Sequence, residues 1–238
     1  MSQEKSLSDY PQAMQAEVAR VRQVVSDLHA ELPRYELVVW TAGNVSQRVR
    51  HPEITDGSGD LFVIKPSGVS YDELTAESMV VCTIDGELLD GKHAPSSDTA
   101  AHAYTYAHMP HVGGVVHTHS TYATAWAARG EEIPCVLTMM ADEFGGPIPV
   151  GPFAIIGDDS IGRGIVETLR ESRSPAVLMA NHGPFTIGKD ARAAVKAAVM
   201  CEEVARTVHM AYQVGTPKPI EQKHIDSLYD RYQNVYGQ

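Results

Sequence analysis

Two histidines one residue apart, His117 and His119, end a short apolar run that follows a pair of glycines. In an extended strand, residues i and i+2 point to the same face and their Cα atoms lie roughly 6.6 Å apart, so both imidazoles can reach one metal ion. A strand end with two surface histidines explains this pair, taken alone, equally well.

A third histidine, His182, follows the apolar residues 176–180, and Asp98 stands at a predicted helix start. A lone histidine in such a place is more often structural, and an aspartate at a helix start usually caps the helix. Together with the histidine pair, however, these residues supply three nitrogens and one oxygen. That set suits Zn²⁺, or another divalent cation such as Mn²⁺ or Co²⁺.

Two short polar segments have the composition of an anion site. Lys65, Ser67 and Gly68 follow the predicted strand 61–64, and Ser96 and Ser97 precede the predicted helix 99–108. An ammonium group, hydroxyls and free backbone N–H groups at a helix start can hold a phosphate, although capping explains the serines as well.

Two other polar stretches are less specific. Gly43 and Asn44 lie between β-prone runs, where they form either a plain turn or a close approach of the backbone to a ligand. Thr138 and the acidic pair Asp142-Glu143 lie in the Gly- and Pro-rich residues 134–153, predicted to be loop and strand. A solvated surface pair is the ordinary explanation of these two carboxylates.

Composition limits the classes of protein that the chain can belong to. Its net charge of −11 argues against a general affinity for nucleic acid or an anionic membrane. Three widely spaced cysteines, with no apolar run of 18 residues and no apolar core of a signal peptide near the N-terminus, indicate a protein of the reducing cytoplasm.

The elements that must position the polar residues can be predicted from periodicity and from turn residues. An apolar stripe predicts a helix over 11–33, which begins after a capping Asp9, and the run 37–41 is β-prone. Asp85-Gly86 predicts a hairpin between the strands 79–84 and 87–89. Further helices are expected over 99–108, 120–129, 157–170 and 190–214, and in the tail 218–236. Strands, hairpins and helices in this order favour an α/β fold, with a mixed sheet covered by helices, in a single domain over 1–238.

Five motifs, in this order, resemble those of the class II aldolase/epimerase family. They are Thr41-Ala42-Gly43-Asn44-Val45-Ser46, Val63-Ile64-Lys65-Pro66-Ser67-Gly68-Val69, Pro95-Ser96-Ser97-Asp98-Thr99, Val116-His117-Thr118-His119-Ser120 and Asn181-His182-Gly183-Pro184-Phe185. The resemblance runs from about residue 34 to residue 238. It implies a three-layer α/β/α domain with a largely antiparallel sheet, assembled as a homotetramer with active sites between subunits.

The resemblance also implies roles for individual residues. A zinc-type ion would be held by His117, His119 and His182, with Asp98 in the fourth ligand position. Substrate and phosphate would be bound by Gly43, Asn44, Lys65, Ser67, Gly68, Ser96 and Ser97, with Thr138 and His224 as neighbours in the active site. Asp142 and Tyr236 match the two acid/base groups of the epimerase members, and Tyr236 reaches in from a neighbouring subunit.

The activity implied is a metal-dependent epimerisation at carbon 4 of a phosphorylated ketopentose, through cleavage and re-formation of the bond between carbons 3 and 4. A family aldolase that acts on a 1-phosphorylated deoxyketose is the alternative, but the fuculose-phosphate type has a glutamate after its two serines, where this chain has Asp98. A non-enzymatic head domain like that of adducin is the third possibility, and such a domain has no need of the complete set of metal ligands.

Overall fold

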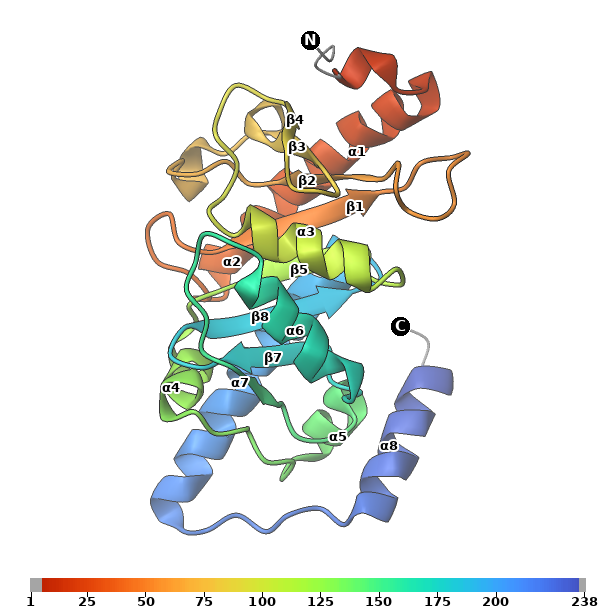
Figure 1. The fold of residues 1–238 in the computed structure, drawn as a ribbon. Coiled ribbons are helices and arrows are strands. Elements are labelled where there is room, and N and C mark those ends of the chain that lie inside the picture. The colour runs from red at the N-terminus through yellow and green to blue at the C-terminus, as the bar shows by residue number, and fades with distance from the viewer. Residues whose placement is uncertain (1–5, 236–238) are drawn as a thin grey trace.

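Several strands are buried on both faces, and this places the sheet in the middle of the molecule (Figure 1). In strand β2 (Leu61–Ile64), Leu61 and Val63 pack into the cluster that contains helices α1 (Gln12–His29) and α7 (Ala191–Val214). Phe62 and Ile64 pack into the cluster with α3 (Thr99–His108) and α6 (Ser160–Arg170). Alternate residues of a strand point to opposite faces, so a strand with all four side chains buried must be covered on both sides.

The structure, a computed structural model, describes residues 6–235 of the chain. Besides β2, the strands are β1 (Asn44–Val49), β3 (Val80–Thr83), β4 (Leu88–Asp90), β5 (Gly114–His117), β6 (Val150–Gly151), β7 (Ala176–Met179) and β8 (Gly183–Gly188). The α-helices are α1 (Gln12–His29), α2 (Glu31–Arg34), α3 (Thr99–His108), α4 (Thr121–Arg129), α5 (Thr138–Phe144), α6 (Ser160–Arg170), α7 (Ala191–Val214) and α8 (Gln222–Asn234). Short 3₁₀ turns lie at Leu7–Asp9, Tyr71–Glu73 and Ala76–Ser78.

The strands form one eight-stranded sheet in the order β4-β3-β2-β1-β5-β8-β7-β6. Every neighbouring pair is antiparallel except β6 with β7, which is parallel. The predicted mixed, largely antiparallel sheet is therefore confirmed. The central pair, β1 and β5, places Asn44 opposite His117 at the end of the sheet where the polar motifs gather.

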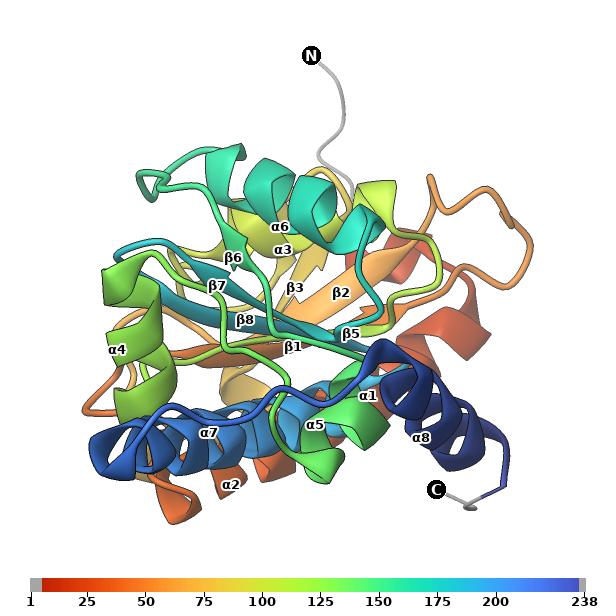
Figure 2. The same cartoon turned by 90° about the horizontal axis from the view of Figure 1, so that it is seen from below.

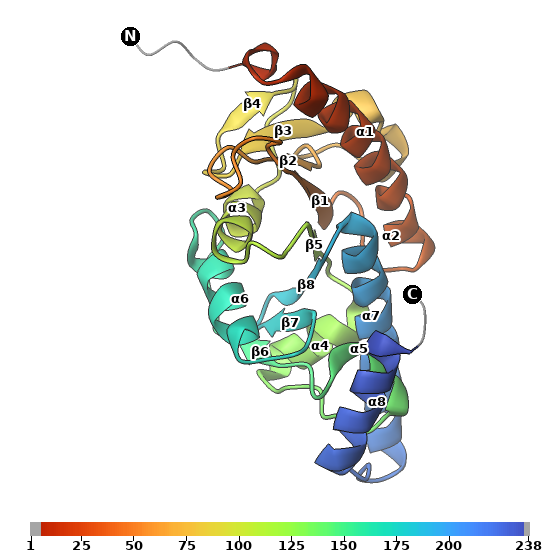
Figure 3. The same cartoon turned by 90° about the vertical axis from the view of Figure 1, so that its right-hand side faces the viewer.

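Helices cover both faces of the sheet (Figures 2 and 3). Helices α3 and α6 lie on one face, and α1 and α7 lie on the other, with α5 and α8 beside α7. The predicted apolar stripe of α1 is confirmed, because Met14, Val18, Val21, Val25 and Leu28 are all buried against the sheet. The α/β fold with a central mixed sheet flanked by helices is the fold that the motifs implied.

Several local predictions were wrong. Residues 37–41 form no strand, because Glu36 and Trp40 have φ values of 56° and 57° and turn the chain away from the sheet, so β1 begins only at Asn44. Asp9 lies in a 3₁₀ turn, and the residue before α1 is Pro11. The stretch 134–153, predicted to be loop and strand, also contains helix α5.

Within residues 6–235, no helix has both the length and the apolar composition needed to span a bilayer.

Candidate metal centre and active site

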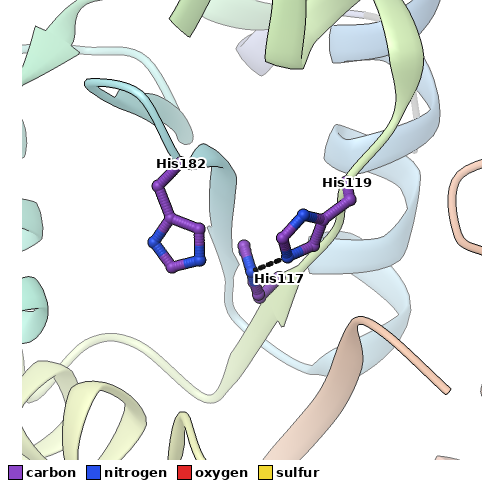
Figure 4. A group of neighbouring side chains, drawn as sticks. All are labelled: His117, His119 and His182. Atoms are coloured by element: carbon purple, nitrogen blue, oxygen red, sulfur yellow. Dashed lines mark hydrogen bonds between the residues drawn. The ribbon is translucent and has the colours of Figure 1, made fainter. Parts of the chain in front are cut away.

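Three histidines, from the end of β5 and from the turn between β7 and β8, converge at one end of the sheet (Figure 4). His117 is the last residue of β5, His119 follows it by two residues, and His182 lies in the tight turn between β7 and β8. The Nε2 atoms of His117 and His119 are 2.9 Å apart, and one nitrogen from each of the three rings lies within 4.8 Å of the others. Two nitrogens bound to one tetrahedral ion at about 2.1 Å are roughly 3.4 Å apart, so these rings could hold a common metal ion.

The turn that carries His182 is pressed closely against the strand that carries His117. A Cβ atom on Gly183 would lie only 2.8 Å from the carbonyl oxygen of Thr118, so glycine is needed for this approach. The ring of Phe185 stacks on the ring of His117, with 4.0 Å between the ring centroids and 13° between the planes. Packing of the backbone and of an aromatic ring thus fixes the geometry of the histidine group.

Hydrogen bonding and burial keep the histidines in the form that binds metals. The Nδ1–H of His117 donates to the carbonyl of Pro184 at 3.0 Å, which leaves its Nε2 lone pair directed toward the group. Burial lowers the pKa of all three rings, and that of His117 well below its ordinary value, whereas the charge of Asp98 raises the pKa of His119 and His182. Imidazole must be neutral to ligate a metal ion, so the environment favours ligation.

Asp98 lies at the start of α3, beside the histidines. Its Oδ2 accepts a hydrogen bond of 2.7 Å from the Nδ2 of Asn44, which also donates to the Oγ of Ser96 at 2.9 Å. The Oδ1 of Asp98 is buried and has no hydrogen-bond partner among residues 6–235. Asp98 is outside the 4.8 Å group formed by the three histidines, so its place as a fourth ligand stays a prediction. A buried, unpartnered carboxylate oxygen next to three neutral imidazoles is the donor set that a divalent cation requires.

The two segments predicted to hold an anion lie side by side. The backbone N–H of Ser96 donates to the carbonyl of Lys65, and that of Ser67 donates to the carbonyl of Ala94. Lys65 is only 2% exposed, and its Nζ donates to the carbonyl oxygens of Thr41 and Pro66, at 3.2 Å each. Ser67, Gly68 and Ser97 are exposed beside this pair of segments.

Gly43 lies against the histidine-bearing strand. Its φ is +81°, and a Cβ atom there would be 2.9 Å from the carbonyl oxygen of His117 and 2.6 Å from Val38. No larger residue fits this position without moving β5. The structure therefore brings Gly43, Asn44, Ser96 and Asp98 together around the end of β5, where Asn44 also pairs with His117.

The remaining predicted residues lie elsewhere in the chain. Thr138 and Asp142 are on α5, and His224 is on α8. Helix α8 packs against α5 and lies apart from α4, the helix that follows the histidine pair (Figures 1 and 2). Burial and the neighbouring Glu143 raise the pKa of Asp142, and Arg231 of α8 lowers it. Thr138 and His224 are exposed. Tyr236 lies outside the described residues.

Sequence reasoning overlooked a buried polar group on the inner side of this site. His102, Ser46 and Tyr106 are linked by hydrogen bonds beneath Asp98. The only signal in the sequence was the four-residue spacing between Asp98 and His102, which places them on one side of a helix.

The comparison with known sequences and structures gives the class of protein. A sequence model of the family described as "Class II Aldolase and Adducin N-terminal domain" matches residues 23–209. The chain belongs to this family.

Individual relatives show which members of the family this chain is similar to. Three curated proteins named L-ribulose-5-phosphate 4-epimerase UlaF, from Salmonella paratyphi B, Salmonella paratyphi A and Salmonella typhi, are each 44% identical to it over 201 residues, which are 81% of this chain and 85% of the relative. A solved L-fuculose 1-phosphate aldolase superposes with a TM-score of 0.81 over 90% of this chain and 96% of its own, at 25% identity. The aldolase of that name from Thermus thermophilus shares the fold, with a TM-score of 0.68 over 84% of this chain and 99% of its own, at 23% identity.

Proposed function

We propose that the protein is a metal-dependent L-ribulose-5-phosphate 4-epimerase, which interconverts L-ribulose 5-phosphate and D-xylulose 5-phosphate. The observation that carries the proposal is the 44% identity, over most of both chains, with curated proteins of that name. The convergence of His117, His119 and His182 beside Asp98 supports it, because the reaction needs a cation at that place.

Cleavage of a carbon–carbon bond solves the chemical problem of this epimerisation. Carbon 4 carries a secondary alcohol whose hydrogen is not acidic, so direct deprotonation at that carbon is unfavourable. Removal of the proton from the carbon 4 hydroxyl instead lets the bond between carbons 3 and 4 break. The aldehyde of the two-carbon phosphate fragment forms, and the electron pair of the broken bond becomes the double bond between carbons 2 and 3 of the other fragment, with negative charge on the oxygen of carbon 2. Rotation of the aldehyde and re-addition to its other face invert carbon 4.

A divalent ion at the histidine group, with Asp98 beside it, would act as a Lewis acid that stabilises negative charge on the oxygens of carbons 2 and 3. We propose Zn²⁺, with Mn²⁺ and Co²⁺ as possible replacements, because all three suit imidazole and carboxylate ligands.

The other residues would bind and orient the substrate. The hydroxyls of Ser67 and Ser97 and the N–H groups of Gly68 and Ser97 can hold the phosphate while the aldehyde turns, and the Lys65 ammonium adds positive charge behind them. Gly43 allows the backbone to approach the substrate, and the Asn44 amide fixes Asp98 and Ser96.

Two acid/base groups are required on opposite faces of the aldehyde, and we propose Asp142 and Tyr236. In one chain the α5–α8 pair, with Thr138, Asp142 and His224, is separate from the histidine group. We therefore propose that these residues serve the site of a neighbouring subunit in a homotetramer. Free, buried Cys82, Cys135 and Cys201 are consistent with the cytoplasmic location that we also propose.

A family aldolase is the second candidate, because the solved L-fuculose 1-phosphate aldolase shares the fold over 90% of this chain. The residue after the two serines favours the epimerase, since this chain has Asp98 there. A purely structural head domain is disfavoured by the complete histidine group.

A coupled assay tests the proposal directly. With Zn²⁺ present, the purified protein should convert L-ribulose 5-phosphate to D-xylulose 5-phosphate, lose the activity in a chelator, and release no free aldehyde from L-fuculose 1-phosphate. Aldehyde release without pentulose conversion would establish the aldolase instead. Inactivity toward both substrates, by a protein with its metal bound, would contradict both assignments.

A further inference from the structure

Two hydrogen bonds connect strand β1 and helix α3 like parallel rungs beneath the candidate metal centre. Asn44 of β1 donates to the Oδ2 of Asp98 at 2.7 Å, and the hydroxyl of Ser46 lies 2.7 Å from the Nδ1 of His102. Asn44 and Ser46 share one face of β1 because they are two residues apart, and Asp98 and His102 are one helical turn apart on α3. The Asn44–Asp98 bond, the upper rung, and the Ser46–His102 bond, the lower rung, are therefore neighbours in the interior.

One consistent set of hydrogen-bond directions around Ser46 places the proton of His102 on Nε2. The hydroxyl of Ser46 is also 2.7 Å from the hydroxyl of Tyr106. Among the described residues, Ser46 is the only acceptor for the Tyr106 hydroxyl, so the phenol donates to Ser46. The Ser46 hydroxyl keeps its own proton, which it can donate to the Nδ1 of His102. A neutral imidazole that accepts at Nδ1 carries its proton on Nε2.

This Nε2–H is a buried donor, and the two atoms left over in the upper rung are buried acceptors. Within residues 6–235, the Nε2 of His102, the Oδ1 of Asp98 and the Oδ1 of Asn44 are all buried and have no hydrogen-bond partner. His102 is completely buried, and the charge of Asp98 acts on it. Burying a polar group without a partner is unfavourable, so a donor and two acceptors in neighbouring bonds are expected to be satisfied, directly or through one ordered water.

We propose that His102 is a positioning residue for the metal centre, whose Nε2–H holds the Asp98–Asn44 pair in place, directly or through one buried water. The inference rests on the metal site of the proposed function. A carboxylate oxygen has two acceptor positions, so Asp98 can bind a cation and accept this hydrogen bond at the same time. Residues that orient metal ligands in this way typically change metal affinity by about 10- to 100-fold when they are replaced.

The test measures Zn²⁺ affinity, by competition with a chromogenic chelator, in full-length variants. His102→Asn keeps a polar group near Ser46 but cannot reach the upper rung, so it should weaken Zn²⁺ binding by roughly 10- to 100-fold. His102→Gln places an amide N–H near the position of Nε2 and should recover most of the affinity. The matched control is His29→Asn, which removes another fully buried imidazole bonded to β1 and should leave Zn²⁺ affinity unchanged while lowering the melting temperature.

Equal Zn²⁺ affinity of the wild type and His102→Asn would overturn the role of His102 and leave the metal site intact. Failure of the wild type to bind Zn²⁺ would overturn the metal site, and this inference with it. If His102→Asn does not fold, ¹⁵N NMR of the wild-type imidazoles decides. A proton on Nε2 with a bare Nδ1 in His102 supports the proposal, and a proton on Nδ1 overturns it.

Discussion

At the scale of single residues, the proposed acid/base group Asp142 is set apart by its surroundings. It is partly buried on α5, and burial together with the charge of Glu143 raises the pKa of its carboxyl, against the opposing charge of Arg231. A carboxyl group whose pKa moves toward neutrality can both take and return a proton more readily during turnover. Asp98, by contrast, is held by Asn44, and its charge acts on His119 and His182.

Replacement of Asp142 by Asn should separate chemistry from binding. The amide cannot exchange a proton with the carbon 4 hydroxyl, so epimerisation should fall by about 10²- to 10⁴-fold. Zn²⁺ affinity should remain that of the wild type, because the histidine group is untouched. Glu143→Gln is the matched control. It loses the ion pair with Lys196 at 3.0 Å but keeps the Asp142 carboxyl, whose pKa is raised chiefly by burial, so it should lose far less activity than Asp142→Asn. Full activity of Asp142→Asn would make Asp142 an ordinary surface carboxylate.

The same variant tests whether subunits share active sites. A mixed tetramer that contains Asp142→Asn chains and His119→Ala chains would contain some sites with an intact histidine group from one chain and an intact Asp142 from the other. Co-refolding two inactive variants should therefore restore part of the activity. A mixture as inactive as its components would place Asp142 in the site of its own chain, or outside it.

The site residues were predictable to different degrees. The His-x-His pair and His182 could be found because motif spacing and strand ends directly indicate convergence. His102 could not, because a single histidine within a helix is usually a structural residue, and only the contacts with Ser46 and Asp98 reveal its setting. The roles of Thr138, His224 and Tyr236 came from family resemblance alone and stay predictions.

At the scale of elements, the contact between α1 and β1 supports the strand that carries Asn44. His29, at the end of α1, uses its Nδ1–H to donate to the carbonyl of Val25 at 2.6 Å, and its Nε2 accepts from the N–H of Val45 at 2.9 Å. The ring must be neutral to accept that bond. Burial lowers the pKa of His29 to about 3.

This contact makes stability dependent on pH in a defined direction. Between the ordinary histidine pKa of 6.5 and about 3, the unfolded chain binds a proton at this residue that the folded chain does not. The stabilising contribution is therefore complete above pH 6.5 and decreases as the pH falls, by up to about 1.4 kcal/mol per pH unit. Urea unfolding at pH 7, 6 and 5 measures this loss. His29→Asn should be less stable at pH 7, and its disadvantage should shrink toward pH 5. A constant difference between the two proteins would show that His29 does not titrate in this way.

Long helices and hairpins were predictable from the sequence because their signals are periodic. The apolar stripe of α1, the long helix α7 and the turn between β3 and β4 all appear where the pattern placed them. The prediction of a strand over residues 37–41 was wrong, because an apolar, β-branched composition does not reveal that the backbone turns at Glu36 and Trp40. These turns leave Val39 and Trp40 73% and 83% exposed. Helix α5 was overlooked because it is two turns long between segments rich in Gly and Pro.

At the scale of the whole molecule, one sheet collects motifs that are far apart in the sequence. Asn44, His117 and His182 are carried by β1, β5 and the turn before β8, which are consecutive in the sheet, and α3 brings Asp98 over the same end. The continuous sheet supports the single domain proposed for residues 1–238. The separation of the α5–α8 pair from the histidines is what a site shared between subunits requires, but the number of subunits depends on surface complementarity that neither motifs nor periodicity encode.

Metal binding by the wild type and by His119→Ala tests the central claim most directly, because the mechanism depends on one cation shared by distant side chains. Elemental analysis and Zn²⁺ titration of the purified proteins should find about one tightly bound ion per wild-type chain and a large loss of affinity in His119→Ala, which removes one of three nitrogen ligands. His182→Ala should behave in the same way although it alters a different strand. A wild-type protein without a stoichiometric divalent ion, or a His119→Ala protein that retains both its ion and its turnover, would contradict the account.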